Sequence, residues 1–595
     1  MHFRKLFLTS VGAAIVWGAG TDSPPSAYGE NSGAVPSDLT RARPIVTTVD
    51  DVVDFPPPKT VAQLPGPDGR VSFREAVIAS NNTPGPQTIA FAIPESDWWL
   101  FTNVALLKLE NGIFNITGDQ TTVDFSTQTA FTGDTNPNGN EVAIYGLEPN
   151  GWGSPAIVVN GNNCVIRGLD SVSQRGYGVM LRGNNNRVVG CTISGPLHAA
   201  VYISGGFGSP PASANTVGGT APNAGNILSA GNSGVRIDGP ATDNIVIGNK
   251  RLSGAFYGAE VRSAPNSSLF AINNRIGGPR PAERNLISDS GHYGEEGFPV
   301  GAQVSLQDAV GTIVQGNYIG TDVTGTSSFG QIGPAGIVAR NSTGTQILGN
   351  LISGIVVVGI NHFAGQRFGT GIVLQGNVTG SVVRGNQIGT DVSGQNAIPN
   401  HAGVATSFWP GSPPPSAVTI GGTGGGDGNK IAFNETIGVA VDVTAHGIRI
   451  SANNIKSNGA LGIDLFDESG AGVTPNDAGD GDDGGNGLQN FPVLQSANVV
   501  SGGTVVAGTF NSLPNSQFSL EFFGNPQCDP SGFGEGARFL GSLTVTTNGS
   551  GNASFQTTVG RAAVGSSITA TATDLSTGNT SEFSACQLAT GSRLD

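Results

Sequence analysis

Gly178-Val-Met-Leu-Arg182 is the stretch that decides the fold, because the same Gly-apolar-x-apolar-polar phrase returns throughout the middle of the chain. Clear further copies are Gly234-Val-Arg-Ile-Asp238, Gly336-Ile-Val-Ala-Arg340, Gly371-Ile-Val-Leu-Gln375 and Gly462-Ile-Asp-Leu-Phe466. The shortest spacing between successive copies is about 22 residues, and longer spacings contain an insertion. A repeat of this length indicates a solenoid in which each copy forms one coil.

Each repeat contains three short strands separated by sharp corners. After Gly178-Val-Met-Leu come Arg187-Val-Val and Cys191-Thr-Ile, with Asn or Gly between them. Three such strands and their corners need about 22 residues, the length of one turn of a parallel β-helix. Alternation along the strand directs Val179 inward and Met180 outward, and corner Asn side chains are expected to hydrogen-bond from coil to coil. A β-propeller is excluded because each of its blades needs about 40 residues.

Bulk composition excludes several classes of protein. The chain has 595 residues, of which 37% are apolar and 12% charged, so it can bury a large core. Its net charge of −15 argues against nucleic acid as a partner, because phosphate binding requires a cationic surface. No organic cofactor is expected, since the sequence contains no phosphate-binding loop, nucleophile elbow or His-Glu-x-x-His helix.

The N-terminus has the layout of a secretory signal. His2, Arg4 and Lys5 precede the apolar run 6–19, and small residues and prolines follow it. We therefore predict a signal peptide over residues 1–29 and a mature protein that is secreted or held at the cell surface, either extracellular or periplasmic. The apolar run, about 14 residues long, is too short to cross a bilayer comfortably, so no membrane span is expected.

Several motifs resemble those of a known group of proteins. Gly69-Arg-Val-Ser-Phe-Arg-Glu-Ala-Val77 is similar to the Ser-Leu-Arg-Glu-Ala start of secreted bacterial right-handed parallel β-helix repeat proteins. Gly316-Asn-Tyr-Ile-Gly-Thr-Asp322 and Thr580-Ser-Glu-Phe-Ser584 are similar to further tracts of that family. The resemblance implies an N-terminal cap with a short helix over residues 73–80. It is specific for architecture and weak for activity, because the family is mostly uncharacterised and a fold does not fix a function.

These observations predict an all-β protein, a right-handed parallel β-helix solenoid with a small C-terminal antiparallel β-sandwich. Residues 30–150 are expected to form the cap and first coils, and residues 151–492 the parallel β-helix. After Pro492 the composition shifts to Thr, Ser and Val in alternating runs such as Ser542-Leu-Thr-Val-Thr-Thr547. Residues 493–595 are therefore predicted to be the β-sandwich module.

The four cysteines fall into two pairs. Cys528 and Cys586 both lie in the C-terminal module and are predicted to form a disulfide, with two free thiols as the alternative. Cys164 and Cys191 occupy places in their repeats that differ by several residues. We expect them to remain two buried thiols.

Outward-facing residues at matching places in the repeat form columns, and we expect the charged part of these columns to be confined to the coils near residues 180–262. Parallel stacking separates neighbours in a column by about 4.8 Å, which places Asp238 and Glu260 roughly 8 Å apart. This separation suits an acid and a base that flank a glycosidic bond. The alternative is a solvated face of alternating charges, in which each ion pair contributes little. The expected substrate-binding side chains of this face are Arg182, Tyr202, Arg236 and Arg262.

Long insertions between repeats supply a second group of candidates. They contain His292 and Tyr293 in one loop and Trp409 in another. All are expected to precede the same strand of their coils, so they should project from one edge and form a wall beside the charged face. Aromatic loops on a rigid scaffold are common places for binding sites, although a lone loop histidine is more often an ordinary surface residue.

The acidic tract 476–486 packs carboxylates and glycines into one loop. Hard oxygen ligands at alternate positions suit Ca²⁺, and glycine allows the tight wrap that such a loop needs. The predicted ligands of a structural Ca²⁺ ion are Asp477, Asp480, Asp482 and Asp483. The tract lacks the Glu that completes an EF-hand loop, and a disordered acidic linker is the alternative.

Two functions of different classes follow from the sequence. The first is a secreted carbohydrate-active protein that binds an extracellular polysaccharide and acts as a glycoside hydrolase or polysaccharide lyase. In that case Asp238 and Glu260 are the catalytic pair. The second is a non-catalytic cell-surface or matrix adhesin in which the solenoid is a spacer. A clustered groove of acids, arginines and aromatic rings favours the first function, and a featureless face favours the second.

Overall fold

The computed structural model describes residues 43–99, 102–137, 139–146, 153–173, 176–206, 210–263, 269–293, 299–329, 333–359 and 366–591. The predicted signal peptide, residues 1–29, lies outside these ranges. Among the described residues, no helix has both the length and the apolar character needed to cross a membrane.

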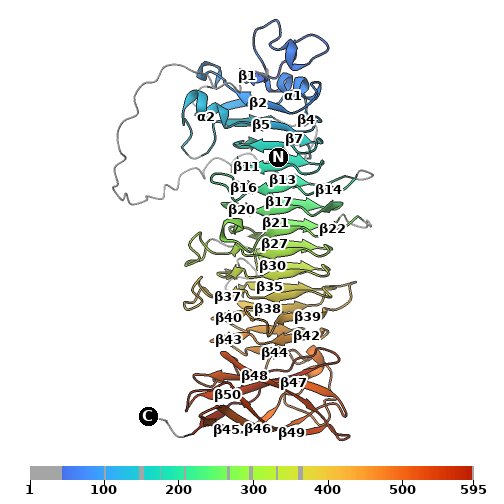
Figure 1. Cartoon of the computed structure of the whole chain (residues 1–595), viewed down its shortest axis with the longest axis vertical. Coiled ribbons are helices and arrows are strands. Elements are labelled where there is room, and N and C mark those ends of the chain that lie inside the picture. Colours follow the sequence, from blue (N-terminus) through green and yellow to red (C-terminus); the bar gives the residue numbers. More distant parts are fainter. Residues whose placement is uncertain are drawn as a thin grey trace, which may run out of the picture. The chain divides into compact units, whose positions relative to one another are not determined.

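The described chain is a right-handed parallel β-helix, with three long parallel sheets formed by its stacked coils (Figure 1). From residue 177 to residue 456, each coil passes through sheet 2, then sheet 1, then sheet 3, and turns sharply between them. The fold class expected from the sequence is confirmed.

Sheet 1 has 13 described strands, which are β1 (Ile45–Val46), β2 (Gln87–Phe91), β5 (Thr121–Asp124), β8 (Val165–Arg167), β11 (Arg187–Val189), β15 (Thr216–Gly218), β19 (Ile245–Ile247), β23 (Arg275–Gly277), β28 (Ile313–Gln315), β31 (Gln346–Leu348), β36 (Val382–Arg384), β39 (Ser416–Gly421) and β42 (His446–Ser451). Sheet 2 has 12 described strands, which are β4 (Phe114–Ile116), β7 (Pro155–Val159), β10 (Tyr177–Leu181), β13 (Ala199–Ile203), β17 (Ser233–Asp238), β21 (Tyr257–Arg262), β27 (Ala302–Gln307), β30 (Ala335–Arg340), β35 (Thr370–Gln375), β38 (Ala402–Ser407), β41 (Val439–Val441) and β44 (Ile463–Leu465). Sheet 3 has nine described strands, which are β12 (Thr192–Ile193), β16 (Ile227–Ala230), β20 (Arg251–Gly254), β24 (Leu286–Ile287), β29 (Tyr318–Ile319), β32 (Leu351–Ile352), β37 (Gln387–Ile388), β40 (Lys430–Ala432) and β43 (Asn454–Lys456).

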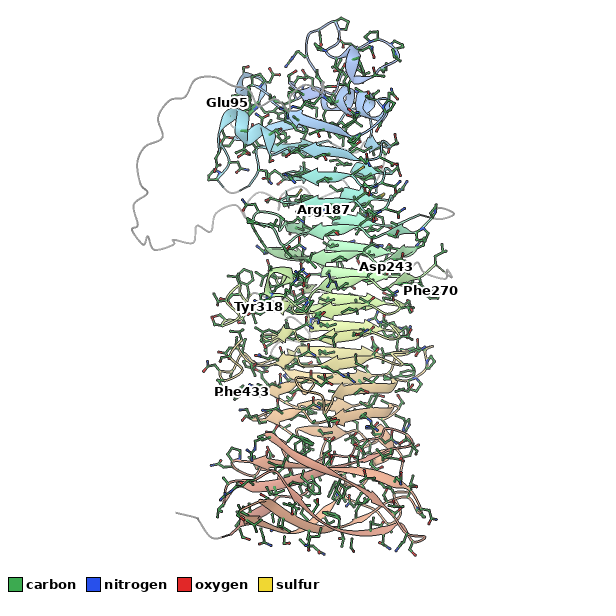
Figure 2. The ribbon with its side chains drawn as sticks, in the orientation of Figure 1. Glu95, Arg187, Asp243, Phe270, Tyr318 and Phe433 are labelled. Carbon is green, nitrogen blue, oxygen red and sulfur yellow. A yellow bond between two sulfur atoms is a disulfide. The ribbon has the colours of Figure 1, made fainter. Side chains whose placement is uncertain are left out.

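Short strands decorate the corners of the stack. They are β3 (Ala105–Lys108), β6 (Val142–Tyr145) and β9 (Val172–Ser173) near the N-terminal end, β14 (Ala212–Ser213), β18 (Ala241–Thr242) and β22 (Ala271–Ile272) between sheets 2 and 1, and the hairpins β25 (His292–Tyr293) with β26 (Pro299–Val300) and β33 (Val357–Val358) with β34 (Arg367–Phe368). Single turns of 3-10 helix occur at η1 (Val61–Gln63), η2 (Glu95–Asp97), η3 (Pro281–Glu283) and η5 (Gly485–Leu488). Figure 2 shows Asp243 and Phe270 at the corner that leaves sheet 2 and Tyr318 and Phe433 on the opposite side of the stack.

The register of sheet 2 follows the repeated phrase. The apolar residue after each Gly pairs with its equivalent in the next coil, as Val179 with Val201 and Ile337 with Ile372. All of these residues are buried in one continuous core. The phrase therefore predicts the strand register, because shifting it by one residue would turn the apolar residues out of the core.

The glycine of the phrase is required by space and not by backbone angle. Gly336 is not in the left-handed region. A Cβ added to it would lie 2.5 Å from the carbonyl oxygen of Gly371 and 2.7 Å from Cγ2 of Ile352 in sheet 3. Any larger side chain would therefore push the next coil and the corner of the core apart.

A ladder of buried asparagines holds the corner before sheet 3. Asn350 is one rung: its Oδ1 accepts from the backbone N–H of Asn317 at 2.9 Å, and its Nδ2 donates to Oδ1 of Asn386 at 3.0 Å. Since each side chain satisfies a backbone group of the neighbouring coil, the buried polar atoms are paired without water. This confirms the expected hydrogen bonding between coils. The rungs are Asn226, Asn249, Asn285, Asn317, Asn350, Asn386, Asn429 and Asn453.

The N-terminal end of the stack is closed by α1 (Phe73–Asn81). The hydroxyl of Ser72 accepts from the backbone N–H of Glu75, and the carboxylate of Glu75 accepts from the backbone N–H of Ser72, which fixes the start of the helix. Phe73 packs against Phe114 of the first sheet 2 strand, with ring centroids 4.5 Å apart. The helix thus covers apolar surface that the first coil would otherwise expose. A second short helix, α2, spans Thr127–Thr132.

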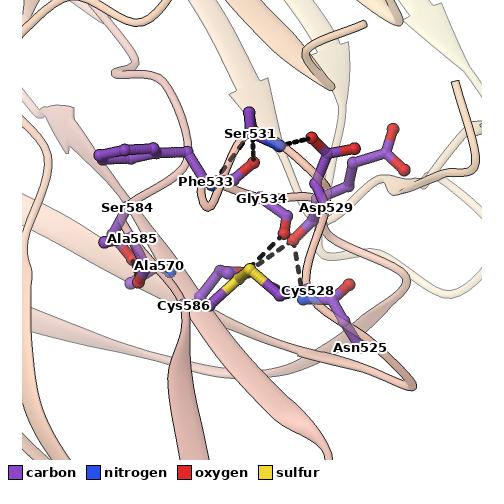
Figure 3. Close-up of a disulfide and its surroundings, with 12 residues drawn as sticks. Asn525, Cys528, Asp529, Ser531, Phe533, Gly534, Ala570, Ser584, Ala585 and Cys586 are labelled. Atoms are coloured by element: carbon purple, nitrogen blue, oxygen red, sulfur yellow. Dashed lines mark hydrogen bonds between the residues drawn. A yellow bond between two sulfur atoms is a disulfide. The ribbon is translucent and has the colours of Figure 1, made fainter. Parts of the chain in front are cut away.

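The C-terminal module is a seven-stranded sheet folded around its own core. The expected antiparallel pairing holds for all neighbours except β45 and β51, which pair in parallel and join the two halves. Cys528 and Cys586 form a disulfide (Figure 3), while Cys164 and Cys191 are buried free thiols. The strands are β45 (Val493–Val500), β46 (Gly503–Asn511), β47 (Gln517–Asn525), β48 (Arg538–Thr546), β49 (Asn552–Val559), β50 (Ser567–Asp574) and β51 (Gln587–Thr590).

Three glutamates of this module bind the free edge of the last coil. Glu521 accepts from the hydroxyl of Ser451 at 2.6 Å, Glu535 accepts from the side chain of Asn458 at 2.8 Å, and Glu582 accepts from the backbone N–H of Leu465 at 3.0 Å. They therefore satisfy donors that would pair with a further coil if the stack continued. All three carboxyls are buried.

Candidate functional site

The outward face of sheet 2 brings the predicted catalytic and binding residues together. Strand pairing places Tyr202 beside Arg236, and Arg236 beside Glu260. At the next outward-facing position of the same two strands, Asp238 pairs with Arg262. We call these five residues, together with Tyr177, the charged cluster. The register alone creates it, because its members come from four successive coils.

Asp238 lies at the centre of the charged cluster. Arg236 donates to both of its oxygens, at 2.9 and 2.8 Å, and Arg262 donates to the same two oxygens at 3.0 and 3.3 Å. The hydroxyl of Tyr202 also donates to Asp238, at 3.2 Å. Burial raises the pKa of Asp238, and the charge and hydrogen bonds of Arg236 oppose that rise. Asp238 is therefore fully bonded, and both arginines are paired with it.

Glu260 is less fully bonded. Among the described residues it receives one hydrogen bond, from the hydroxyl of Ser233 at 2.7 Å. Nε of Arg236 and Nε of Arg262 each lie 3.7 Å away. Glu260 is only 6% exposed, and this burial raises the pKa of its carboxyl above the ordinary value of 4.5. Glu260 thus has fewer hydrogen bonds to hold its carboxyl in the ionised form than Asp238 has.

The two carboxyls are close enough to act on one bond. Nε of Arg262 lies 3.0 Å from Oδ1 of Asp238 and 3.7 Å from Oε1 of Glu260. The two oxygens are therefore no more than about 7 Å apart, a limit that excludes the wider part of the range of roughly 5 to 9.5 Å seen for acid pairs of glycosidases. The cluster is not a solvated face of alternating charges, because Asp238 and Glu260 are 7% and 6% exposed.

Two stacked tyrosines border the charged cluster. The rings of Tyr177 and Tyr202 lie 4.5 Å apart and nearly parallel, and the guanidinium of Arg236 lies over the Tyr202 ring at 5.6 Å. Tyr177 was not among the residues predicted from the sequence, because it precedes the repeated phrase by one position. Burial raises the pKa of both hydroxyls, so they remain protonated hydrogen-bond donors. Arg182 is exposed and occupies the same place in its repeat as Asp238 and Arg262.

The predicted loop residues divide between the two edges of sheet 2. His292 and Tyr293 precede β27, and the hydroxyl of Tyr293 donates to the carbonyl of Val358 in the hairpin before β35, at 3.0 Å. His292 packs edge-on against Phe256, with centroids 4.1 Å apart. Trp409 instead follows β38 and lies at the opposite edge, so the prediction that all three share one wall is wrong for Trp409. The cause is that the insertion predicted around Trp409 contains strand β38 itself, so Trp409 comes after this strand. The spacing of the repeats does not reveal where the strand begins.

Arg340 is a further residue of this face, in the outward column of Arg262 and Gln307, and it is not among the binding residues predicted from the sequence. Its guanidinium lies over the ring of Trp409 at 3.9 Å, and its Nε donates to Oε1 of Gln375 at 2.9 Å. The signal for it was present, because Arg340 ends a copy of the repeated phrase. Its partner Trp409 lies in a loop outside the repeat, so the spacing of the repeats gave no indication of this contact.

The acidic loop brings three of its four predicted ligands together. Oxygens of Asp477, Asp480 and Asp482 lie within 4.8 Å of one another. Oδ1 of Asp477 and Oδ1 of Asp482 are buried without a hydrogen-bond partner among the described residues, which suits a cation. Asp480 is instead bonded to Gln489 at 2.6 Å and Asn490 at 2.8 Å, and burial raises its pKa to about 6. The carboxylate of Asp483, which is not part of this group, accepts from the backbone N–H of Gly484.

Comparison with known proteins gives distant structural likenesses only. No family model and no curated protein matches the chain. A tailspike protein mutant of E. coli bacteriophage HK620, in complex with a pentasaccharide, is 13% identical, with 90% of this chain and 93% of that chain covered and a TM-score of 0.36. The A-module of Azotobacter vinelandii mannuronan C-5 epimerase AlgE4 is 12% identical over 67% and 95% of the two chains, with a TM-score of 0.35. The Dettilon tailspike protein is 11% identical over 83% and 93%, with a TM-score of 0.34.

Proposed function

We propose that the charged cluster binds and cleaves an extracellular polysaccharide. The observation that carries the proposal is the unequal environment of two neighbouring buried carboxyls. Asp238 is held by two arginines and Tyr202, whereas Glu260 has one hydroxyl partner, and burial raises the pKa of both carboxyls. Carboxyls that share a site but differ in protonation are the usual arrangement for acid and base roles.

Glu260 is the proposed proton donor to the glycosidic oxygen. Its burial keeps the neutral acid available above the ordinary pKa of a glutamate. Arg236 and Arg262, whose Nε groups lie between the two acids, favour the ionised form of Asp238. In a hydrolysis, Asp238 would accept the proton of the water molecule that adds to the sugar carbon as the glycosidic C–O bond breaks. The rings of Tyr177 and Tyr202 stack on each other beside the two acids, and their hydroxyls stay protonated because burial raises the pKa of both.

A non-catalytic surface protein is the second candidate. It is favoured by one observation, which is that Asp238 has no free oxygen while it holds both arginines. In that case the charged cluster would only bind neighbouring coils to one another. The two candidates differ in the role of the Glu260 proton: the first requires it for turnover of a polysaccharide, and the second does not.

The deciding experiment is a panel of purified polysaccharides, with new reducing ends and the absorbance of unsaturated uronates as readouts. Glu260→Gln is expected to lower turnover of the active substrate by about 10²- to 10⁴-fold, the usual contribution of a general acid. Glu283→Gln is the matched control, because Glu283 is also buried and bonded to an arginine but belongs to η3. Equal turnover in wild type and Glu260→Gln would remove Glu260 from the mechanism, and a complete lack of turnover across the panel would favour the non-catalytic candidate.

A further inference from the structure

Arg340 stands in the same outward column as Asp238 and Arg262. Strand pairing connects Arg262 to Gln307 and Gln307 to Arg340. Because each step between parallel strands is about 4.8 Å, Arg340 lies roughly 10 Å from Arg262 along the stack. A chain-like ligand that runs along sheet 2 from the charged cluster would reach it.

The guanidinium of Arg340 is held in place before any ligand binds. One face lies over the ring of Trp409, and its Nε is bonded to Gln375. Gln375 is in turn fixed by its own amide, which donates to the carbonyl of Phe408 at 3.3 Å. A guanidinium fixed in this way loses little side-chain entropy when it binds a further group.

Arg236 and Arg262 are paired with the carboxylate of Asp238, and Arg340 differs from them in this respect. Among the described residues, no carboxylate forms an ion pair with it, and its two terminal nitrogens donate no hydrogen bond. Asp308 and Tyr257 act on it only through space, and burial lowers its pKa. Arginine nevertheless stays protonated in proteins. Arg340 is therefore a half-buried cation whose two terminal nitrogens have no partner in the part of the chain that the structure describes.

We propose that Arg340, supported by Trp409, binds a carboxylate or sulfate group of an acidic polysaccharide. The two terminal nitrogens of a guanidinium match the two oxygens of such a group. This inference rests on the proposed function for the position of the chain on sheet 2, and it adds the class of substrate. It also moves the anion-binding role from Arg236 and Arg262, which Asp238 occupies, to Arg340.

Isothermal titration with oligogalacturonate, a sulfated heparin oligosaccharide and a neutral dextran oligosaccharide tests the proposal. Arg340→Gln is expected to weaken binding of at least one acidic probe by about 10- to 100-fold, which corresponds to the loss of a charge-assisted hydrogen-bonded pair. Trp409→Ala is expected to weaken it less. Binding of the acidic probe by the wild type should also weaken as salt increases.

Arg284→Gln is the matched control, because Arg284 likewise stacks on an aromatic ring, that of Tyr318, at 3.8 Å, but lies before sheet 3. Acidic probes that bind Arg340→Gln as tightly as the wild type, or that do not bind the wild type, would overturn the subsite. The proposed function is judged separately, by the effect of Glu260→Gln on turnover. Neutral substrates that lose turnover in Glu260→Gln but not in Arg340→Gln would leave the function standing without the subsite.

Discussion

Replacing Glu535 by Gln tests how the C-terminal module is attached to the last coil. Oε1 of Glu535 accepts from the backbone N–H and the side-chain Nδ2 of Asn458, at 3.3 and 2.8 Å. Asn458 is the last rung of a short ladder that begins at Asn400 and continues through Asn434. A glutamine can keep the accepting oxygen, so the substitution removes the ionisable group and retains this contact.

The size of the effect follows from the pKa of Glu535. Burial raises it from the ordinary value of 4.5 to about 7, and the nearby charge of Asp529 adds to the rise. Raising a pKa by one corresponds to about 1.4 kcal/mol of free energy, so ionisation of the docked glutamate lowers the stability of the fold by roughly 3 kcal/mol. Because the pKa is raised on folding, this stability is present below about pH 4.5, falls as pH rises to about 7, and changes no further above that.

The measurement is urea denaturation at intervals between pH 5 and pH 9, with hydrogen exchange of the peptide 454–466 as a local readout. The wild type is expected to lose stability across this range, and Glu535→Gln to lose about 3 kcal/mol less. Glu582, whose pKa burial raises to about 8, remains in the variant, so part of the decline should persist. Identical pH profiles for wild type and variant would refute the account of Glu535 as a buried acid that docks the module.

Three further predictions concern the repeat and the acidic loop. Gly336→Ala should destabilise the protein by about 1–3 kcal/mol in chemical denaturation, because its Cβ would meet a backbone oxygen 2.5 Å away. Gly549→Ala is the control and should be neutral, because the space around Gly549 is open. Equal effects of the two substitutions would count against the steric explanation. Asn350→Ala should cost about 2–4 kcal/mol, since it leaves the backbone groups of Asn317 and Val314 unpaired, and a midpoint unchanged from wild type would show that the ladder contributes nothing. Ca²⁺ added after chelation is proposed to raise the melting temperature in calorimetry, and Asp482→Asn to reduce that rise; no heat and no shift in the wild type would end the calcium proposal.

Much of the scaffold could be predicted because it depends on local pattern. The apolar residues of the phrase specify both the buried face and the register, so Val179 and Val201 pair as expected. The outward column follows from the same register, which is why Asp238, Glu260 and their arginines could be brought together in advance. Corner asparagines were recognisable because one residue type recurs at one place in each coil.

Contacts that the repeat does not encode could not be predicted. Trp409 reaches Arg340 from a loop whose length differs from coil to coil. Glu521 and Glu535 of the C-terminal module meet the last coil across 70 and 77 residues of sequence. Burial of the charged cluster was also missed, because outward residues of a strand are solvated unless side chains of neighbouring coils cover them.

The sequence by itself therefore determined a stack of coils, the direction of each side chain and the set of residues on sheet 2, since these depend on periodicity and strand geometry. Only the tertiary structure decided which of those residues remain available for a ligand. That depends on distances between side chains from different coils and loops: Asp238 is bonded to Arg236 and Arg262, whereas Arg340, over Trp409, has no carboxylate partner among the described residues. Charge pairing is set by these distances, which the spacing of residues in the chain does not contain.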